Sequence, residues 1–255
     1  MNNEEILHEG VNVVVRVGNT VRRIPGKWTP SVHALLKYLR SHRFVSVPEP
    51  LGFDKKGREI LSFIEGEVGT YTLTSAARSN AALISAAKLL RAYHDATVDF
   101  LSSHHGDWQL ENHPPLEVIC HGDYAPYNCV YSKDQVIGML DFDMAHPGSR
   151  VWDVAYAVYR FAPITAPDNQ DGFGTCQAQA ERARLFCDTY GLRERENLIP
   201  TVLERISALV DFLYARANAG NTIYQKFVAE GHDKLYLNDL NYIKNNQEFF
   251  IKNIL

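Results

Sequence analysis

Cysteine is scarce in this chain, and charge of either sign shows little excess. Four of the 255 residues are cysteines, and no two form a Cys-x-x-Cys pair. In a chain without a secretory signal we expect reduced thiols at Cys120, Cys129, Cys176 and Cys187. The net charge of −4 lacks the basic excess that a nucleic-acid partner would favour, so we predict no such partner.

Long apolar runs are also missing. No run approaches the ~20 residues that a membrane-spanning helix needs. The segment from Met1 to Glu5 is acidic and polar, whereas a signal peptide has a basic start and an apolar core. We therefore expect no membrane partner and a cytoplasmic location. The hydrophobic content of 45% still supports a sizeable core, in one large domain or in two lobes.

The N-terminal quarter has the pattern of a small β-rich unit. Two β-branched runs, 11–17 and 20–24, are joined by Gly-Asn and predict a hairpin. A helix is expected to follow, with Thr29 as its N-cap and a proline at its first position. Residues 59–64 predict a further strand, and the pattern breaks at 65–67, where we expect a hinge.

From about residue 75 the pattern becomes helical. Apolar residues repeat at helical spacing up to His94, which we interpret as a packed core histidine. Residues 162–177 are rich in Pro, Gly, Asp and Asn and predict a long loop. Helices are expected at about 178–190, 196–219 and 235–253. Aromatic residues line the last of these, and we expect them in the core, with a wall of a binding pocket as the alternative.

Two polar segments around a short apolar run carry the chemistry. The first is His121-Gly122-Asp123-Tyr-Ala-Pro-Tyr-Asn128, and the second contains Asp141 and Asp143. Taken singly, each of these residues is typical of a turn, because Gly accepts a positive φ and Asp or Asn bonds its own backbone. Together they supply a carboxylate that orients a hydroxyl group and the hard oxygen ligands that Mg²⁺ prefers.

This pattern resembles the catalytic loop and metal loop of the aminoglycoside phosphotransferase family, which has a protein-kinase-like fold and also contains choline and homoserine kinases. The resemblance implies Asp123 as catalytic base, with His121 as support for its loop. It implies Asn128 and Asp141 as Mg²⁺ ligands. Asp143 is expected either to help hold a second Mg²⁺ or to bond only to backbone.

The resemblance extends to the segment from Pro147 to Ala155, where it implies that Asp153 braces the catalytic loop. We therefore predict an α+β, protein-kinase-like fold. A small β-rich N-lobe would span 1–66 and cover the nucleotide. A larger, mostly helical C-lobe at 67–255 would hold the catalytic loop, the metal loop and the acceptor site.

The sequence features expected for nucleotide binding are incomplete. Kinase-like folds place a basic residue on an N-lobe strand, and strand alternation points Arg23 into the cleft, the alternative being a solvated arginine. The hinge residues Phe63, Ile64 and Glu65 would present backbone groups to the base of ATP or GTP, which the sequence does not distinguish. No Gly-x-Gly-x-x-Gly loop occurs, and the first helix has no obvious glutamate to hold the basic residue.

We therefore expect a Mg²⁺-dependent phosphotransferase that moves the γ-phosphoryl group of ATP or GTP to a hydroxyl of a small acceptor. Aminoglycosides and metabolites, amine-bearing compounds among them, are the candidate acceptors. The alternative is a kinase-fold binding protein with weak or no catalysis that acts as an immunity or sequestering factor. Short members of the family described as trifolitoxin-immunity-like resemble this chain and support that alternative. The oligomeric state is not readable from the sequence.

Overall fold

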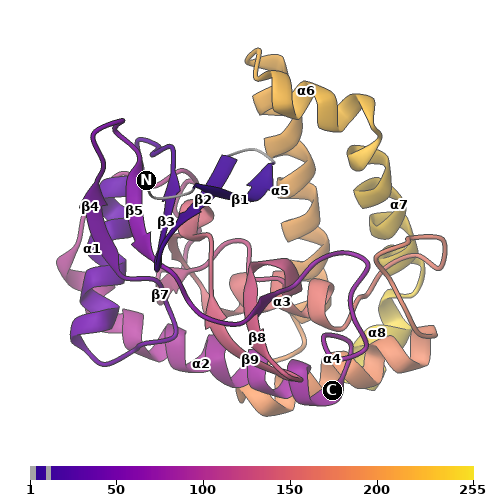
Figure 1. Cartoon of the computed structure of the whole chain (residues 1–255). Helices are drawn as coiled ribbons and strands as arrows, with labels where there is room; N and C mark the ends of the chain where they lie inside the picture. The colour runs from indigo at the N-terminus through magenta and orange to yellow at the C-terminus, as the bar shows by residue number, and fades with distance from the viewer. Residues whose placement is uncertain (1–3, 10–12) are drawn as a thin grey trace.

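The structure is a computed structural model that describes residues 4–9 and 13–255 of the chain. A β-rich part at the N-terminal end stands beside a larger, mostly helical part, as Figure 1 shows. This agrees with the predicted α+β architecture. Residues 11 and 12 of the first predicted strand lie outside the described residues.

The N-terminal part is built on one antiparallel sheet of five strands, in the order β1-β2-β3-β5-β4. The strands are β1 (Glu5–Glu9), β2 (Val13–Val17), β3 (Thr20–Arg23), β4 (Pro50–Phe53) and β5 (Glu59–Ser62). The predicted hairpin is β2–β3, and the predicted strand at 59–64 is β5, two residues shorter than expected. In the pairing of β3 with β5, Arg23 lies opposite Glu59. This register determines the surroundings of Arg23.

Helix α1 (Thr29–Ser41) follows β3, as predicted, but its cap differs from the prediction. The N-cap residue is Trp28, and Thr29 is already inside the helix. The Thr29 hydroxyl oxygen accepts a hydrogen bond from the Gly26 backbone N–H at 2.9 Å. This bond closes the turn that precedes the helix. The Thr29 side chain therefore stabilises that turn and does not cap the helix.

The remaining chain is mostly helical, with two small sheets that carry the loops of interest. The sheets are β7 with β10, and β6-β8-β9. The strands are β6 (Glu67–Val68), β7 (Val118–Cys120), β8 (Cys129–Ser132), β9 (Gln135–Met139) and β10 (His146–Gly148). The helices are α2 (Asn80–Ser103), α3 (Arg150–Phe161), α4 (Cys176–Tyr190), α5 (Leu198–Asn218), α6 (Thr222–Ala229), α7 (His232–Asn245) and α8 (Gln247–Ile254).

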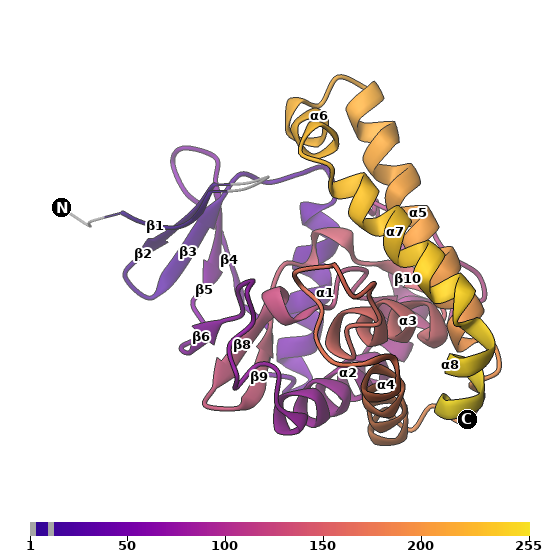
Figure 2. The same cartoon turned by 90° about the vertical axis from the view of Figure 1, so that its right-hand side faces the viewer.

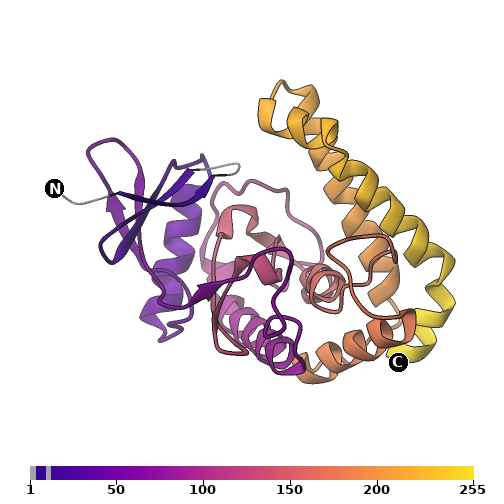
Figure 3. The same ribbon diagram turned by 45° about the vertical axis from the view of Figure 1, so that its right-hand side comes forward.

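The C-terminal helices differ from the prediction in one respect. The single helix expected at 235–253 is two helices, because α7 ends at Asn245 and α8 begins at Gln247. An additional short helix, α6, lies at the far end of the arm that α5 and α7 form in Figure 3. Within the described residues, no helix combines the length and apolar character that crossing a membrane requires.

Helix α2 joins the two parts. Its apolar stripe, which includes Leu83 and Leu90, is fully buried, and the predicted core histidine His94 is fully buried on the same helix. The helix packs against α4, β7 and β9, and also against α1 of the N-terminal part. Figure 2 shows the N-terminal sheet standing to one side of the helical part. The polar loops that follow β7 and β9 lie where these parts meet.

Candidate active site

Asp123 lies in the loop between the buried strand β7 and β8. Its Oδ1 accepts a hydrogen bond from the Tyr127 hydroxyl at 2.7 Å, and its Oδ2 accepts one from Asn128 Nδ2 at 2.9 Å. Burial raises the pKa of Asp123, and the charge of Asp141 adds to this, while the bond from Tyr127 opposes it. The carboxylate is therefore held in one orientation and is more basic than usual.

His121 connects the Asp123 loop to the segment that follows β9. Its Nε2–H donates to the Leu140 carbonyl at 2.9 Å, so its Nδ1 is free to accept from the Asp123 backbone N–H at 3.3 Å. Between them, Gly122 has φ +78°, and a Cβ there would lie 2.1 Å from the Met144 carbonyl oxygen. Only glycine fits this position. His121 is thus placed as a support for the loop, the role that the resemblance implies.

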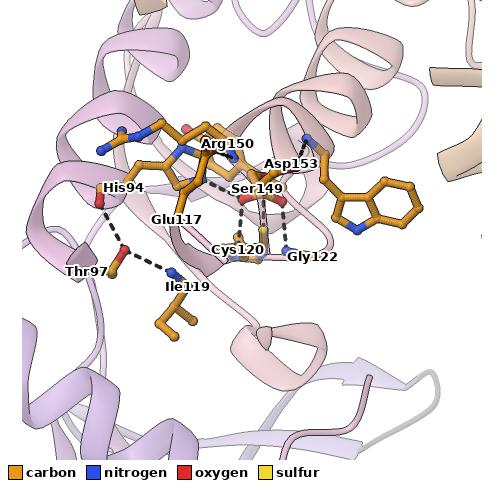
Figure 4. Close-up of polar contacts among 12 residues, drawn as sticks. His94, Thr97, Glu117, Ile119, Cys120, Gly122, Ser149, Arg150 and Asp153 are labelled. Atoms are coloured by element: carbon orange, nitrogen blue, oxygen red, sulfur yellow. Dashed lines mark hydrogen bonds and ion pairs between the residues drawn. The ribbon is translucent and has the colours of Figure 1, made fainter. Parts of the chain in front are cut away.

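Asp153, on the first turn of α3, holds the same loop from the other side (Figure 4). Its Oδ2 accepts from the His121 backbone N–H at 2.7 Å, and its Oδ1 accepts from the Gly122 backbone N–H at 2.9 Å. The carboxylate is fully buried, which would raise its pKa, but the bond and charge of His94 and the His121 N–H hold it well below the usual range. Asp153 thus bonds to two consecutive backbone N–H groups of this loop, and its role as a brace stays a prediction.

His94 does more than fill the core. It lies between the carboxylate of Asp153, 2.9 Å from its Nε2, and the hydroxyl of Tyr190, 2.7 Å from its Nδ1. Burial lowers the pKa of His94, partly offset by Asp153, and its Nε2–H donates to the carboxylate. The predicted core histidine therefore also connects α2 to the catalytic loop.

Arg205, on α5, is a contact that the sequence did not indicate. Its Nη2 donates to the Gly122 carbonyl, and its guanidinium lies 5.4 Å from the ring of Trp152 and 4.7 Å from that of Tyr156. Asp153 and Arg205 thus bind the N–H and the carbonyl of the same glycine. No local pattern in α5 points to this role, because Gly122 is 83 residues away.

The metal-loop residues Asn128 and Asp141 are brought together by the pairing of β8 with β9. Cys129 lies opposite Met139, and the Leu140 N–H donates to the Asn128 carbonyl at 2.9 Å. Asp141 follows with φ +60°, a left-handed conformation that a non-glycine residue seldom adopts. Strained backbone of this kind is typical of functional sites.

Arg23 lies against these carboxylates. Its Nη1 bonds to Asp141 at 2.7 Å, its Nη2 to Asp143 at 2.6 Å, and its Nε to Glu59 at 2.5 Å. His33, on α1, contacts the second oxygen of Glu59 at 2.7 Å. The first helix supplies no glutamate to Arg23, as the sequence indicated; a strand glutamate, itself bonded to a helix histidine, contacts Arg23 instead. Glu59 and His33 were missed because only the β3–β5 register brings them to Arg23.

The local charge suits a divalent cation. One guanidinium faces three carboxylates, and burial, followed by the charge of Asp141, raises the pKa of Asp143 to about 6 against the opposing effect of Arg23. Asn128 uses its Nδ2 on Asp123, which leaves its Oδ1 as an acceptor. No three His, Cys, Asp or Glu residues of the described chain form a metal cluster. An amide and one or two carboxylates are the type of set that holds Mg²⁺ together with substrate phosphates.

The predicted hinge residues follow β5. The Phe63 N–H donates to the Asn19 carbonyl at 3.1 Å, and its ring lies 3.7 Å from the Arg16 guanidinium, which also pairs with Glu65. Within the described chain, the backbone groups of Ile64 and Glu65 form no hydrogen bond. They are therefore available to a ligand.

Comparison with known proteins agrees with this geometry. A model of the family described as "Phosphotransferase enzyme family" matches residues 107–186, which include the Asp123 and Asp141 loops and Asp153. The trifolitoxin immunity protein of Rhizobium leguminosarum bv. trifolii is 33% identical over 195 residues, 73% of each chain. This chain belongs to the phosphotransferase enzyme family.

Solved structures of other proteins have the same fold. A choline/ethanolamine kinase family protein from Mesorhizobium loti aligns over 100% of this chain and 92% of its own, with TM-score 0.66 and 15% identity. The GDP and kanamycin complex of an aminoglycoside phosphotransferase aligns over 94% and 93%, with TM-score 0.59 and 16% identity. These likenesses confirm the predicted protein-kinase-like fold.

We expect the free energy of unfolding to decrease as the pH falls from about 6.5 to about 4, because burial lowers the pKa of His146 to about 4 against the opposing bond to Met144. The unfolded state takes up a proton across this window and the folded state does not. Above this pH window, His146 does not reduce the free energy of unfolding. Below the window, its protonation in the unfolded state has reduced that free energy by up to about 3 kcal/mol. Denaturant unfolding at several pH values would measure this.

The control for this prediction is a pair of variants. His146→Gln is expected to flatten the pH dependence, and substitution of the exposed His105 by Gln should leave it unchanged. Asp143, whose pKa is raised, acts in the opposite direction, so the difference between wild type and His146→Gln is the informative quantity. An identical slope in the two proteins would contradict the prediction.

Proposed function

We propose that this chain transfers the γ-phosphoryl group of ATP or GTP to a hydroxyl group of a small acceptor, in a reaction that requires Mg²⁺. The observation that carries the proposal is one constellation. The Asp123 carboxylate, fixed by Tyr127 and Asn128, lies in the loop that also supplies Asn128 to the charged cluster of Asp141. Phosphoryl transfer needs this combination of an oriented carboxylate, cation ligands and fixed positive charge.

Each side chain has a role in this proposal. Asp123 orients the acceptor hydroxyl and accepts its proton, and its raised pKa suits a general base as long as it remains ionised. Asn128 and Asp141 would hold Mg²⁺, with Asp143 beside them. Bound Mg²⁺ would neutralise charge on the phosphates. Arg23 would shift from the carboxylates towards the phosphates when Mg²⁺ compensates the carboxylates.

The nucleotide is proposed to lie between an N-lobe at 1–66 and a C-lobe at 67–255. The free backbone groups of Ile64 and Glu65 support this placement, because they can bond to a base as the predicted hinge requires. The complex of a structural neighbour with GDP and kanamycin also supports a nucleotide and a small acceptor as partners. We include the expected cytoplasmic location in the proposal and keep both ATP and GTP as candidates.

A second candidate function is a kinase-fold binding protein that acts as an immunity factor. The relation to the trifolitoxin immunity protein favours it specifically. Arg23 pairs with three carboxylates, which occupy the guanidinium that a kinase would use to hold phosphates. This arrangement also favours the immunity factor. The two candidates differ in their need for a nucleotide, and nucleotide binding therefore discriminates between them.

We expect Mg²⁺ with ATP or GTP to raise the stability of the protein, by about 2.7 kcal/mol at a hundredfold excess over the dissociation constant. The Asp141→Ala variant should lose this effect, because it removes a ligand of the cation. Thermal-shift titrations with each nucleotide, with and without Mg²⁺, would measure it.

Asp134→Ala is the matched control, since Asp134 is an exposed aspartate in the β8–β9 turn. Its response to nucleotide should equal that of the wild type. Unchanged nucleotide binding in Asp141→Ala would count against the metal role of Asp141. No response of the wild type to either nucleotide would favour the immunity factor, and co-purification of a partner would be the next experiment.

A further inference from the structure

A buried arginine lies among tyrosines beside the loop that carries Asp123. Arg160, near the end of α3, is 6% exposed. Its guanidinium lies 4.9, 5.5 and 5.3 Å from the rings of Tyr71, Tyr127 and Tyr159, and its Nη2 donates to the Tyr71 hydroxyl. We name this group, together with Tyr156, the Arg160 cluster.

The Arg160 cluster is connected to the catalytic base. The Tyr127 hydroxyl donates to Asp123 and lies 2.9 Å from the Tyr156 hydroxyl, one helical turn before Arg160. Tyr127 therefore contacts both groups: its hydroxyl bonds to the Asp123 carboxylate and its ring faces the Arg160 guanidinium.

The bonding capacity of Arg160 is incompletely used. Its Nε is buried and has no hydrogen-bond partner among the described residues. Among the described residues, Asp171 is the one carboxylate within ion-pair distance of Arg160. Its Oδ2 lies 3.5 Å from Nη2, and its side chain is 36% exposed. A buried guanidinium is costly without a well-placed anion. Asp171 lies on the loop between α3 and α4, and its contact is with Nη2, so Nε keeps no partner among the described residues.

We propose that the Arg160 cluster binds an anionic group of the acceptor, a carboxylate or a phosphate, while the acceptor hydroxyl lies at Asp123. This inference rests on the proposed function and adds the chemical class of its acceptor. A guanidinium recognises both kinds of anion through paired N–H groups, and the tyrosine rings shield that pair from water. Asp171 is then the internal counter-ion that the bound anion displaces.

The α7 helix supplies a further wall of the same place. On this helix, Asp239 Oδ2 accepts a hydrogen bond from the Tyr159 hydroxyl at 2.6 Å, so α7 lies beside the Arg160 cluster. The same helix carries Tyr236, which belongs to the aromatic stripe for which the sequence left a pocket wall as the alternative to the core. The positive charge of Arg160 disfavours an acceptor whose only charges are amines. It is compatible with an acceptor that also carries an anionic group.

The test is a titration of the free protein with small probes, followed at the Arg160 Nε–H signal in spectra of ¹⁵N-arginine-labelled protein. The probes are acetate, inorganic phosphate and, as neutral control, acetamide. We expect a saturable shift of this signal with one or both anions and none with acetamide. Acetate and phosphate then distinguish a carboxylate acceptor from a phosphorylated one. Arg160→Lys identifies the signal by its disappearance.

Two variants of the α3–α4 loop make the test independent of Arg160→Lys, which could fail to fold. Asp171→Asn is expected to strengthen anion binding about two- to fivefold, because it removes a competing, partly exposed ion-pair partner. Asp168→Asn makes the same charge change in the same loop, but Asp168 bonds to Asn238 and should leave the affinity unchanged.

The proposal would be overturned by the absence of a saturable shift with either anion. Equal affinities in Asp171→Asn and Asp168→Asn would overturn it as well. None of these measurements uses a nucleotide or a phosphoryl transfer. A protein that binds anions at Arg160 but shows no Mg²⁺-dependent nucleotide stabilisation would therefore disprove the proposed kinase function and leave the anion site in place.

Discussion

An Asp123→Ala variant is expected to lose turnover by about 10²–10⁴-fold, the range that a positioned general base contributes. This change removes the carboxylate proposed to accept the hydroxyl proton, and no other described carboxylate bonds to both Tyr127 and Asn128. The fold should survive, because Asp123 is only half-buried and its loop is held by Asp153 and Arg205. Initial rates on an identified acceptor, together with the melting temperature, would measure this.

Two controls accompany the Asp123 variant. Asp134→Ala removes an exposed aspartate from the neighbouring β8–β9 turn and should keep full turnover. Binding of Mg²⁺ and nucleotide to Asp123→Ala, measured by calorimetry, should stay close to that of the wild type, because Asp123 is not among the proposed ligands. Full activity of Asp123→Ala would show that another group accepts the proton.

Substitution of Asp153 by Ala is expected to reduce the free energy of unfolding by about 3–5 kcal/mol, the usual cost of breaking a buried charged pair. The change leaves His94 and the backbone N–H groups of His121 and Gly122 buried without their acceptor. The catalytic loop should also become less protected. Denaturant unfolding and amide hydrogen exchange of the loop would measure the two effects.

Asp95→Ala is the matched control for Asp153. Asp95 follows His94 in α2 and pairs with Arg91 and Arg150, but its side chain is 48% exposed, so its loss should cost about 0–1 kcal/mol. The pKa of Asp153 is depressed, so its contribution is complete above its unfolded pKa of about 3.9 and is lost as the pH falls through its folded pKa. A cost for Asp153→Ala no larger than for Asp95→Ala would contradict its role as a brace.

The arrangement around Arg23 bears on both candidate functions. The Arg23 guanidinium pairs with Glu59 of the N-terminal part and with Asp141 and Asp143 of the helical part, so it stabilises the contact between the two parts. A kinase must replace two of these partners with phosphates and Mg²⁺, at a cost in binding free energy. An immunity factor could keep the contact permanently. The nucleotide titration with Asp141→Ala tests this difference directly.

The sequence by itself determined the family, the order of strands and helices in outline, and the residues of the two central loops. These features are local: the Gly-Asn hairpin, the helical stripe through Leu83 and Leu90, and the spacing of Asp123, Asn128 and Asp141 are all encoded within short segments. Local signals were weaker at the C-terminal end, where one expected helix is two. The Thr29 side chain, expected to cap α1, closes a turn instead.

The tertiary structure alone decided which distant side chains surround those loops. Glu59 reaches Arg23 through a strand register, Arg205 reaches Gly122 from α5, and Arg160 meets Tyr127 through the packing of α3. Such contacts join residues that are far apart in the chain, and no local period records them. Their geometry depends on how strands pair and helices pack, because burial of the shared core, rather than any short motif, brings these charged groups together.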